Sequence, residues 1–201
     1  MVLFTVLIIP VEEASRRLRA DHDVLSAEVN GLADEQLAAT YRLTSGPLGD
    51  FCESLHDLVA HVLMWDEINL AVLTEAAVGR AHWSLDPRWE TPKAGRLLNR
   101  SGVAAGRQLP ASLLLHRLRA ARDGVLAELA RYDGQAWADA GQTGQAWASA
   151  GQLPSLAQGI GRLAQYVWAA PGQPAFWHAA LHLNQLPLAS QPANPASAPP
   201  S

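Results

Sequence analysis

The chain has 201 residues, 49% of them hydrophobic, which is enough for the core of one domain with a short tail. Its formal net charge of −4 and its lack of any Lys/Arg cluster argue against a general nucleic-acid-binding protein, which would present a basic patch. The single cysteine, Cys52, rules out an internal disulfide and fits a reducing compartment. Because Cys52 precedes an expected helix start, two interpretations stay open: a thiol of lowered pKa, or a small buried residue.

The apolar start of the chain, residues 1–9, does not resemble a signal peptide. It is short and lacks both a basic leading region and a small-residue cleavage site. No apolar run in the sequence reaches the roughly 18 residues of a membrane span. We therefore expect a soluble, cytoplasmic protein that binds neither a membrane nor nucleic acid.

Apolar residues recur at helical spacing along most of the chain, which predicts helices in chain order. The first main helix is predicted over residues 10–29, followed by a short helical turn within residues 33–39. The second is predicted to begin near Ser54, a favoured N-cap residue, and to continue to about Val78, where Gly79 ends it.

A long connection, residues 80–110, leads to the third main helix and is expected to contain one short helix near residues 92–98. The third main helix is predicted over residues 110–132. A ten-residue unit beginning Gly-Gln-Ala-Trp then occurs twice within residues 134–152 and is interpreted as a local duplication in a surface loop.

The fourth main helix is predicted over residues 154–170, and after the break at residues 171–174 a last helix reaches about Leu186. No alternating strand pattern competes with these helices. The sequence therefore predicts an all-α, four-helix bundle in residues 1–188, with a long connection between its second and third helices. Residues 189–201, rich in Pro, Ala and Ser, are expected to form a disordered tail.

Three histidines in two distant helices predict a metal site. His178 and His182 are four residues apart, so their imidazoles project from one helix face about 6 Å apart. His61 lies on the apolar stripe of the second main helix, in phase with Leu58 and Trp65 at about 100° per residue. Three protein ligands leave a coordination position open, as in reactive metal sites. A buried, hydrogen-bonded core histidine is the ordinary alternative for each residue.

Helical phase separates the remaining histidines. His56 and His116 are predicted to point outward, and His82 is placed in a loop. His22 lies between Leu18 and Leu25 on the inward stripe of the first helix, which makes it a weak candidate for a fourth polar group at the site.

Two further residues are weak catalytic candidates. Gln185 shares a face with His178 and could orient a ligand or touch a substrate. Of the acids near His61, Asp57 is the one whose phase brings it to the metal side, as a general base. Asp66 and Glu67 are carboxylates that could also act as a base, but a solvated helix face is the ordinary expectation for all three acids.

The histidine contexts resemble those of the DinB superfamily of four-helix bundles. The family pattern has a histidine in an apolar second helix with a tryptophan four residues later, as in His61 and Trp65. A His-x3-His motif with a glutamine three residues on is similar to His178, His182 and Gln185. The resemblance covers roughly residues 11–186.

The superfamily includes thiol-transferase-like DinB proteins, the metal-binding domain of mycothiol-dependent maleylpyruvate isomerase and the ClbS/DfsB group. Membership would imply Zn²⁺ or Ni²⁺ held by the three histidines and chemistry with a low-molecular-weight thiol. The chain departs from this pattern in its long connection, its Gln/Trp repeat and the prolines of residues 171–174.

Three functional hypotheses follow. The first is a metal-dependent thiol transferase or hydrolase acting on a small electrophilic molecule in stress or detoxification, with Trp83, Trp89 and Trp177 shaping an aromatic pocket. The second is a non-catalytic module that binds a metal or a small molecule. The third is a structural bundle that dimerises through apolar surface such as the Ala-rich third helix. A homodimer is expected in the first two cases as well.

Overall fold

The computed structural model describes residues 10–40, 51–78, 80, 82–86, 88, 91–131 and 178–183. Its described regular elements are all helices, apart from an isolated bridge between Thr40 and Ser54. The protein is therefore all-α over the part of the chain that is described, as the sequence predicts. None of the described helices is long and apolar enough to cross a membrane.

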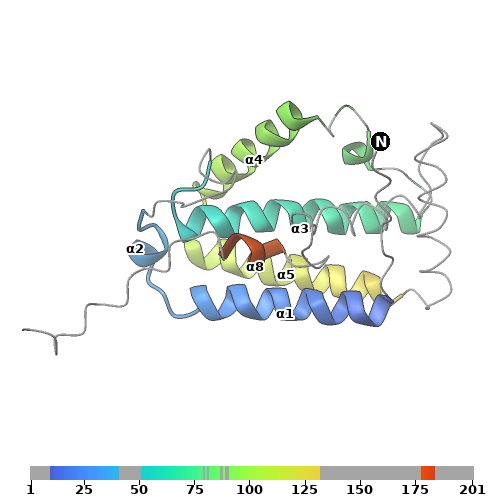
Figure 1. Ribbon diagram of the computed structural model, residues 1–201, viewed down its shortest axis with the longest axis horizontal. Helices are drawn as coiled ribbons and strands as arrows, with labels where there is room; N and C mark the ends of the chain where they lie inside the picture. Colours follow the sequence, from blue (N-terminus) through green and yellow to red (C-terminus); the bar gives the residue numbers. More distant parts are fainter. Residues whose placement is uncertain are drawn as a thin grey trace, which may run out of the picture.

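Three long helices lie alongside one another: α1 (Val11–Val29), α3 (Leu55–Ala77) and α5 (Ala111–Leu129) (Figure 1). α5 packs against both α1 and α3. The short helix α8 (His178–Leu183) lies against α1 and α3, so it brings a segment far along the sequence onto the first half of the chain. The predicted bounds of the three long helices are confirmed to within three residues.

α3 is the central helix of the described structure. Residues 57–63 are all buried, because α4, α5 and α8 each pack against it. A helix that is apolar around most of its circumference is stable only when neighbours cover it. One hydrophobic cluster joins these helices and includes Leu25, Val29, Leu37, Phe51, Leu58, Val62, Leu63, Leu114 and Leu118.

The N-terminus of α3 is fixed by local hydrogen bonds. The Oγ of Ser54 accepts the N–H of Asp57 at 3.1 Å, and a carboxylate oxygen of Asp57 accepts the N–H of Glu53 at 2.9 Å. These contacts satisfy backbone donors that have no partner within the first turn. The predicted helix start near Ser54 is confirmed.

Shorter elements complete the fold: α2 (Asp34–Leu37), the 3₁₀ helix η2 (Trp83–Leu85) and α4 (Pro92–Gly106). α4 is more than twice as long as predicted. Thr91 caps it, accepting the N–H of Ala94 at 3.2 Å. Its glycines lower the intrinsic helix propensity, which is why the sequence underpredicts it, and packing on α3 offsets that loss.

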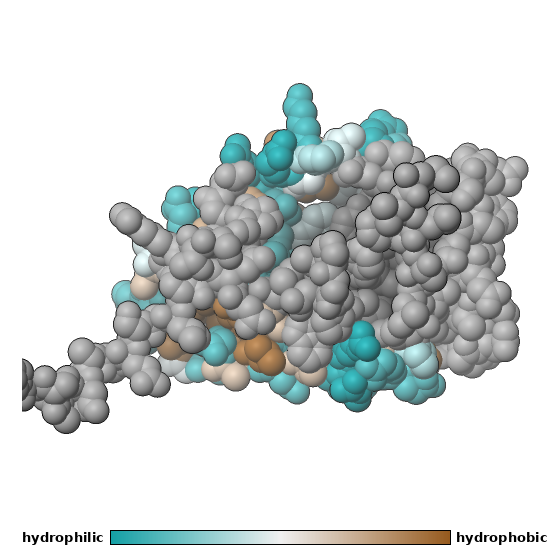
Figure 2. Space-filling view, viewed as in Figure 1, coloured by the Kyte–Doolittle hydropathy of each residue, from teal (hydrophilic) through white to brown (hydrophobic). Residues whose placement is uncertain are grey.

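Hydrophilic side chains gather over α4 at the upper edge of the molecule and over the start of α1 at the lower right (Figure 2). At the start of α1, Glu13 bonds to both Arg16 and Arg17. These solvent-accessible ion pairs join charges on neighbouring turns of a single helix, an arrangement that contributes little to stability.

Several predictions concern residues that the structure does not describe. They are residues 1–9, the repeat at 134–152, the fourth main helix at 154–170 and the tail at 189–201. The division into a domain of residues 1–188 and a tail stays a prediction.

Two glycines let α4 approach α3 closely. A Cβ built on Gly106 would overlap the Cβ of Ala60, and one built on Gly102 would overlap the sulfur of Met64. At Gly95, in the same helix, a Cβ would meet no atom within 4 Å. Gly106 is therefore the position at which the two helices tolerate least extra volume, because its neighbour is a short side chain that cannot move aside.

We expect Gly106→Ala to lower the free energy of unfolding by about 1–3 kcal/mol, because overpacking forces the two helices apart. Gly102→Ala should cost less, since the flexible Met64 side chain can shift. Gly95→Ala is the matched control and should stabilise by about 0.5–1 kcal/mol through helix propensity. Urea unfolding of the three variants checks the order, and equal effects at Gly106 and Gly95 would contradict the close approach.

Candidate metal centre

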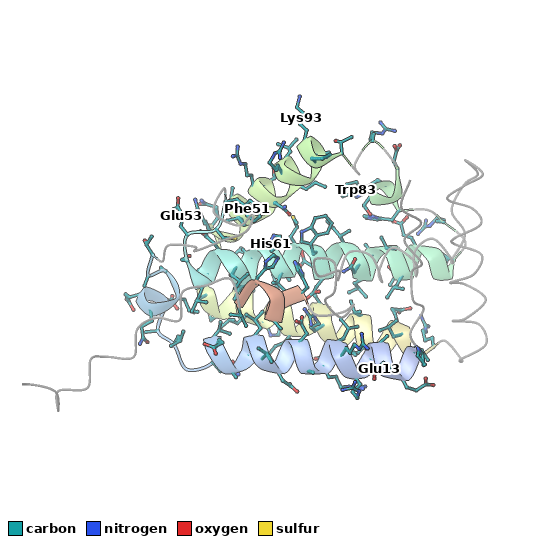
Figure 3. All side chains as sticks on the ribbon, in the orientation of Figure 1. Glu13, Phe51, Glu53, His61, Trp83 and Lys93 are labelled. Carbon is teal, nitrogen blue, oxygen red and sulfur yellow. The ribbon has the colours of Figure 1, made fainter. Side chains whose placement is uncertain are left out.

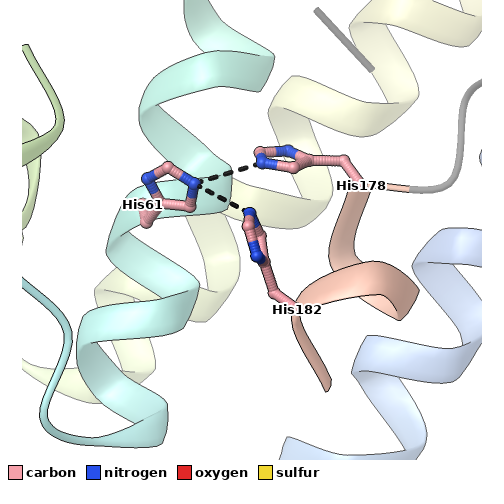
Figure 4. Close-up of side chains that lie close together, drawn as sticks. All are labelled: His61, His178 and His182. Carbon is pink, nitrogen blue, oxygen red and sulfur yellow. Dashed lines mark hydrogen bonds between the residues drawn. The ribbon is translucent and has the colours of Figure 1, made fainter. Parts of the chain in front are cut away.

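The structure brings His61, His178 and His182 together. His61 projects from the side of α3 that faces α8, and the two other rings extend from α8 toward it (Figures 3 and 4). The Nε2 atom of His61 lies 3.1 Å from that of His178 and 3.3 Å from that of His182. Each of the three residues offers a ring nitrogen within 4.8 Å of the other two.

These separations suit a shared cation. Zn–N bonds of about 2.0–2.1 Å in a tetrahedron place two ligand nitrogens about 3.3 Å apart. The two measured Nε2–Nε2 distances lie close to that value. The rings meet edge to face, with interplanar angles of 67° to 68°, so the nitrogens converge and the ring faces do not stack.

Burial favours the neutral form, which a metal requires, in two of the three rings. The exposed fraction is 3% for His61 and 7% for each of the other two. Desolvation lowers the pKa of His61 well below its usual value, and the nearby His182 adds to the effect. Desolvation likewise lowers the pKa of His178, with smaller contributions from His182, His61 and Arg122. Neutral imidazoles keep a lone pair available, as metal binding demands.

The second ring nitrogen of His61 is also buried. Within the part of the chain that the structure describes, Nδ1 of His61 has no hydrogen-bond partner. The ring of Phe51 lies beside it, with centroids 5.3 Å apart. His61 is therefore oriented by packing, whereas metal-bound histidines usually donate the second N–H to an acceptor.

A buried charge cluster supports α8, and sequence reasoning missed it. The carboxylate of Asp21 in α1 accepts the N–H of Ala180 at 2.8 Å and that of Ala179 at 3.1 Å. Both terminal nitrogens of Arg122 in α5 lie 3.2 Å from Asp21, and its Nε donates to Asp66 in α3 at 2.6 Å. The cluster thus links α1, α3, α5 and α8. Burial raises the pKa of Asp66 to about 6, and Arg122 opposes that rise.

His22 is not part of this centre. It is half-buried on α1 and lies 3.3 Å from the hydroxyl of Ser26, on its own helix. Desolvation lowers the pKa of His22, and the charge of Arg122 adds to the shift. The buried polar residue on the inward stripe of α1 is its neighbour Asp21. The position of Asp21 between Leu18 and Leu25 is the sequence signal that could have indicated its burial.

Asp57 is engaged elsewhere. Its two carboxylate oxygens accept hydrogen bonds from Arg107 at 2.8 and 2.6 Å, which ties the start of α3 to the end of α4. It lines a cavity of about 270 Å³ together with Ala38, Thr40, Glu53, Ser54, His56 and Arg107, a set that does not include the three histidines. Its role as a general base stays a prediction.

Asp66 and Glu67 also have arginine partners, Arg122 and Arg117. The prediction that Asp66 lies on a solvated face is wrong: it is buried at 3% exposure. Glu67 is partly exposed, as expected. Gln185, Trp89 and Trp177 lie outside the described residues, so their predicted roles are untested.

Other histidines and the cysteine are placed clearly. His116 is exposed, as predicted, whereas His56 is half-buried, and its Nε2 lies 3.2 Å from the carbonyl oxygen of Leu109. The connection between α4 and α5 covers it. His82 is buried against Ser84 at the start of η2.

Cys52 is buried, and desolvation raises the pKa of its thiol to about 12. The interpretation of Cys52 as a thiol of lowered pKa is therefore wrong.

Comparison with protein-family models, with curated proteins and with solved structures finds no match for this chain. The features of the chain that bear on its function are therefore the geometry of this centre and the sequence motifs around its histidines.

Proposed function

We propose that this chain is a DinB-like four-helix-bundle protein that binds one divalent cation, Zn²⁺ or Ni²⁺, through His61, His178 and His182. The observation that carries the proposal is the convergence of three buried ring nitrogens from two helices, with two separations of 3.1 and 3.3 Å. Imidazole nitrogen is a preferred ligand of both metals.

The residues present fit such a cation. Nε2 of His61 lies close to two other ring nitrogens, but in a neutral ring that atom carries either one N–H or one lone pair, so without a cation it can serve only one of the two contacts well. A cation accepts all three lone pairs at once. The ligand cluster among the described residues holds three members, which leaves a position for water or substrate.

The proposed activity is thiol transfer to, or hydrolysis of, a small electrophilic molecule, with a low-molecular-weight thiol as the co-substrate in the first case. A bound cation lowers the pKa of a coordinated water or thiol and polarises a carbonyl group. The histidines hold the cation, and their apolar surroundings limit water access. A cytoplasmic homodimer working in stress or detoxification completes this proposal.

One observation favours a non-catalytic alternative, in which the bundle binds a metal or a small molecule without turnover. The acids near His61 in the sequence, Asp57, Asp66 and Glu67, are each bonded to an arginine. A cation in this centre would have to supply the nucleophile without help from them. Turnover of a chromogenic electrophile that depends on both added thiol and bound metal separates the two functions.

Elemental analysis of untagged protein tests the metal directly. We expect about one equivalent of zinc or nickel per chain in the wild type, lost in His61→Ala. His116→Ala is the matched control, because it removes an exposed imidazole outside the cluster and should keep its metal. A wild type that carries no more metal than His61→Ala would end the proposal.

A further inference from the structure

The short helix α8 has little stability of its own. Its described residues, His178–Leu183, number six, far fewer than an isolated helix needs to persist in water. Its position therefore depends on tertiary contacts with α1 and α3. Because it carries two of the three imidazoles, whatever fixes α8 also sets their distance from His61.

The Asp21 side chain accepts hydrogen bonds from the start of this helix. Its two carboxylate oxygens accept the N–H groups of Ala179 and Ala180, the residues that directly follow His178. Donors in a first helical turn have no partner within the helix, and a negative charge there is favourable. One fully buried carboxylate thus satisfies two of these donors.

Arg122 holds the carboxylate of Asp21 in place. Its two terminal nitrogens lie 3.2 Å from one oxygen of Asp21, and one of them also donates to the carbonyl oxygen of Leu18 at 3.1 Å. Asp66 receives the remaining Nε–H bond. The guanidinium is therefore fixed by α1 and α3, and Asp21 cannot turn away from α8 without leaving a buried charge unpaired.

We propose that Asp21 is a positioning residue of the three-histidine centre: by capping α8 through the amides of Ala179 and Ala180, it fixes His178 and His182 opposite His61. This inference rests on the proposed function for its metal readout. Loose support of ligand side chains weakens a site even when every ligand is present. Asp66, in the same cluster, has no such contact with α8 and serves as the reference.

Asp21→Asn and Asp66→Asn form a matched pair. Each removes one negative charge, preserves the side-chain shape and leaves one aspartate paired with Arg122. Zn²⁺ affinity is measured for both by competition with a chromogenic chelator. Hydrogen exchange of the amides of Ala179 and Ala180 is measured in the metal-free proteins. Both experiments use one concentration of stabilising osmolyte at which both variants are folded.

We expect Asp21→Asn to weaken Zn²⁺ binding about tenfold or more, in the range seen when outer partners of metal ligands are removed. Exchange at Ala179 and Ala180 should speed up by a similar factor, since the opening of α8 becomes easier. Asp66→Asn should change either quantity less than about threefold, even if it lowers global stability as much.

Two outcomes overturn the inference: wild-type affinity in Asp21→Asn, or equal losses in both variants. A wild type that binds neither Zn²⁺ nor Ni²⁺ overturns the proposed function alone. In that case, amide exchange still decides whether Asp21 positions α8: selective acceleration in Asp21→Asn supports it, and unchanged exchange refutes it.

Discussion

Replacing Arg122 by methionine is expected to lower the free energy of unfolding by about 3–5 kcal/mol. The side chain is 1% exposed and lies between two buried carboxylates, those of Asp21 and Asp66. Methionine fills a similar volume but leaves both carboxylates without their cation in a dry interior. Such a loss is a large fraction of the stability of an ordinary domain, and urea unfolding measures it.

Arg117→Met is the matched control for that change. Arg117 lies on the same helix and pairs with Glu67, but the two side chains are 42% and 40% exposed. Water screens this pair, so its loss should cost less than about 1 kcal/mol. If Arg122→Met were as mild as Arg117→Met, the buried cluster would not stabilise the fold in the way described.

Lowering the pH from about 7 to about 5.5 is expected to destabilise the metal-free protein by about 2 kcal/mol through the buried groups. The pKa values of His61 and His178 are lowered in the folded state, so the unfolded chain takes up protons below pH 6.5 that the folded chain does not. This loss is partly offset by Asp66, whose raised pKa favours protonation of the folded state in the same window.

Urea unfolding of EDTA-treated protein across this pH range checks the result. His61→Ala should flatten the pH dependence by about half of the histidine contribution, because one buried imidazole has been removed. His116→Ala should leave it unchanged, since that ring is exposed. A wild type whose stability stays level from about pH 7 to 5.5 would show that the buried rings accept protons freely.

The helices were predictable because their apolar faces repeat at helical spacing and their ends carry recognisable signals. Ser54 and Gly79 delimit α3 in the sequence, and the structure places its start as predicted. α4 shows the limit of this reasoning. Its length depends on packing against Ala60 and Met64 of another helix, which local propensity does not report.

The three histidines of the candidate site could be predicted from the sequence, but the buried residues that hold α8 in place could not. His178 and His182 share a face by spacing alone, and phase selects His61 from its neighbours. Asp21 and Arg122 each occupy inward stripe positions, and opposite charges on two apolar stripes were the available signal for a buried pair. That Asp21 also meets the backbone of Ala179 could not be foreseen, because periodicity within one helix says nothing about which distant segment covers it.

The contact between His61 and His178 spans 117 positions of the sequence. A fragment or nascent chain that ends before α8 contains only His61 of the three histidines. One imidazole alone could not retain a cation. Ion uptake would therefore come late, after this long-range pairing has been made. The metal content would then distinguish folded full-length chains, which retain the cation, from truncated products, which lack it.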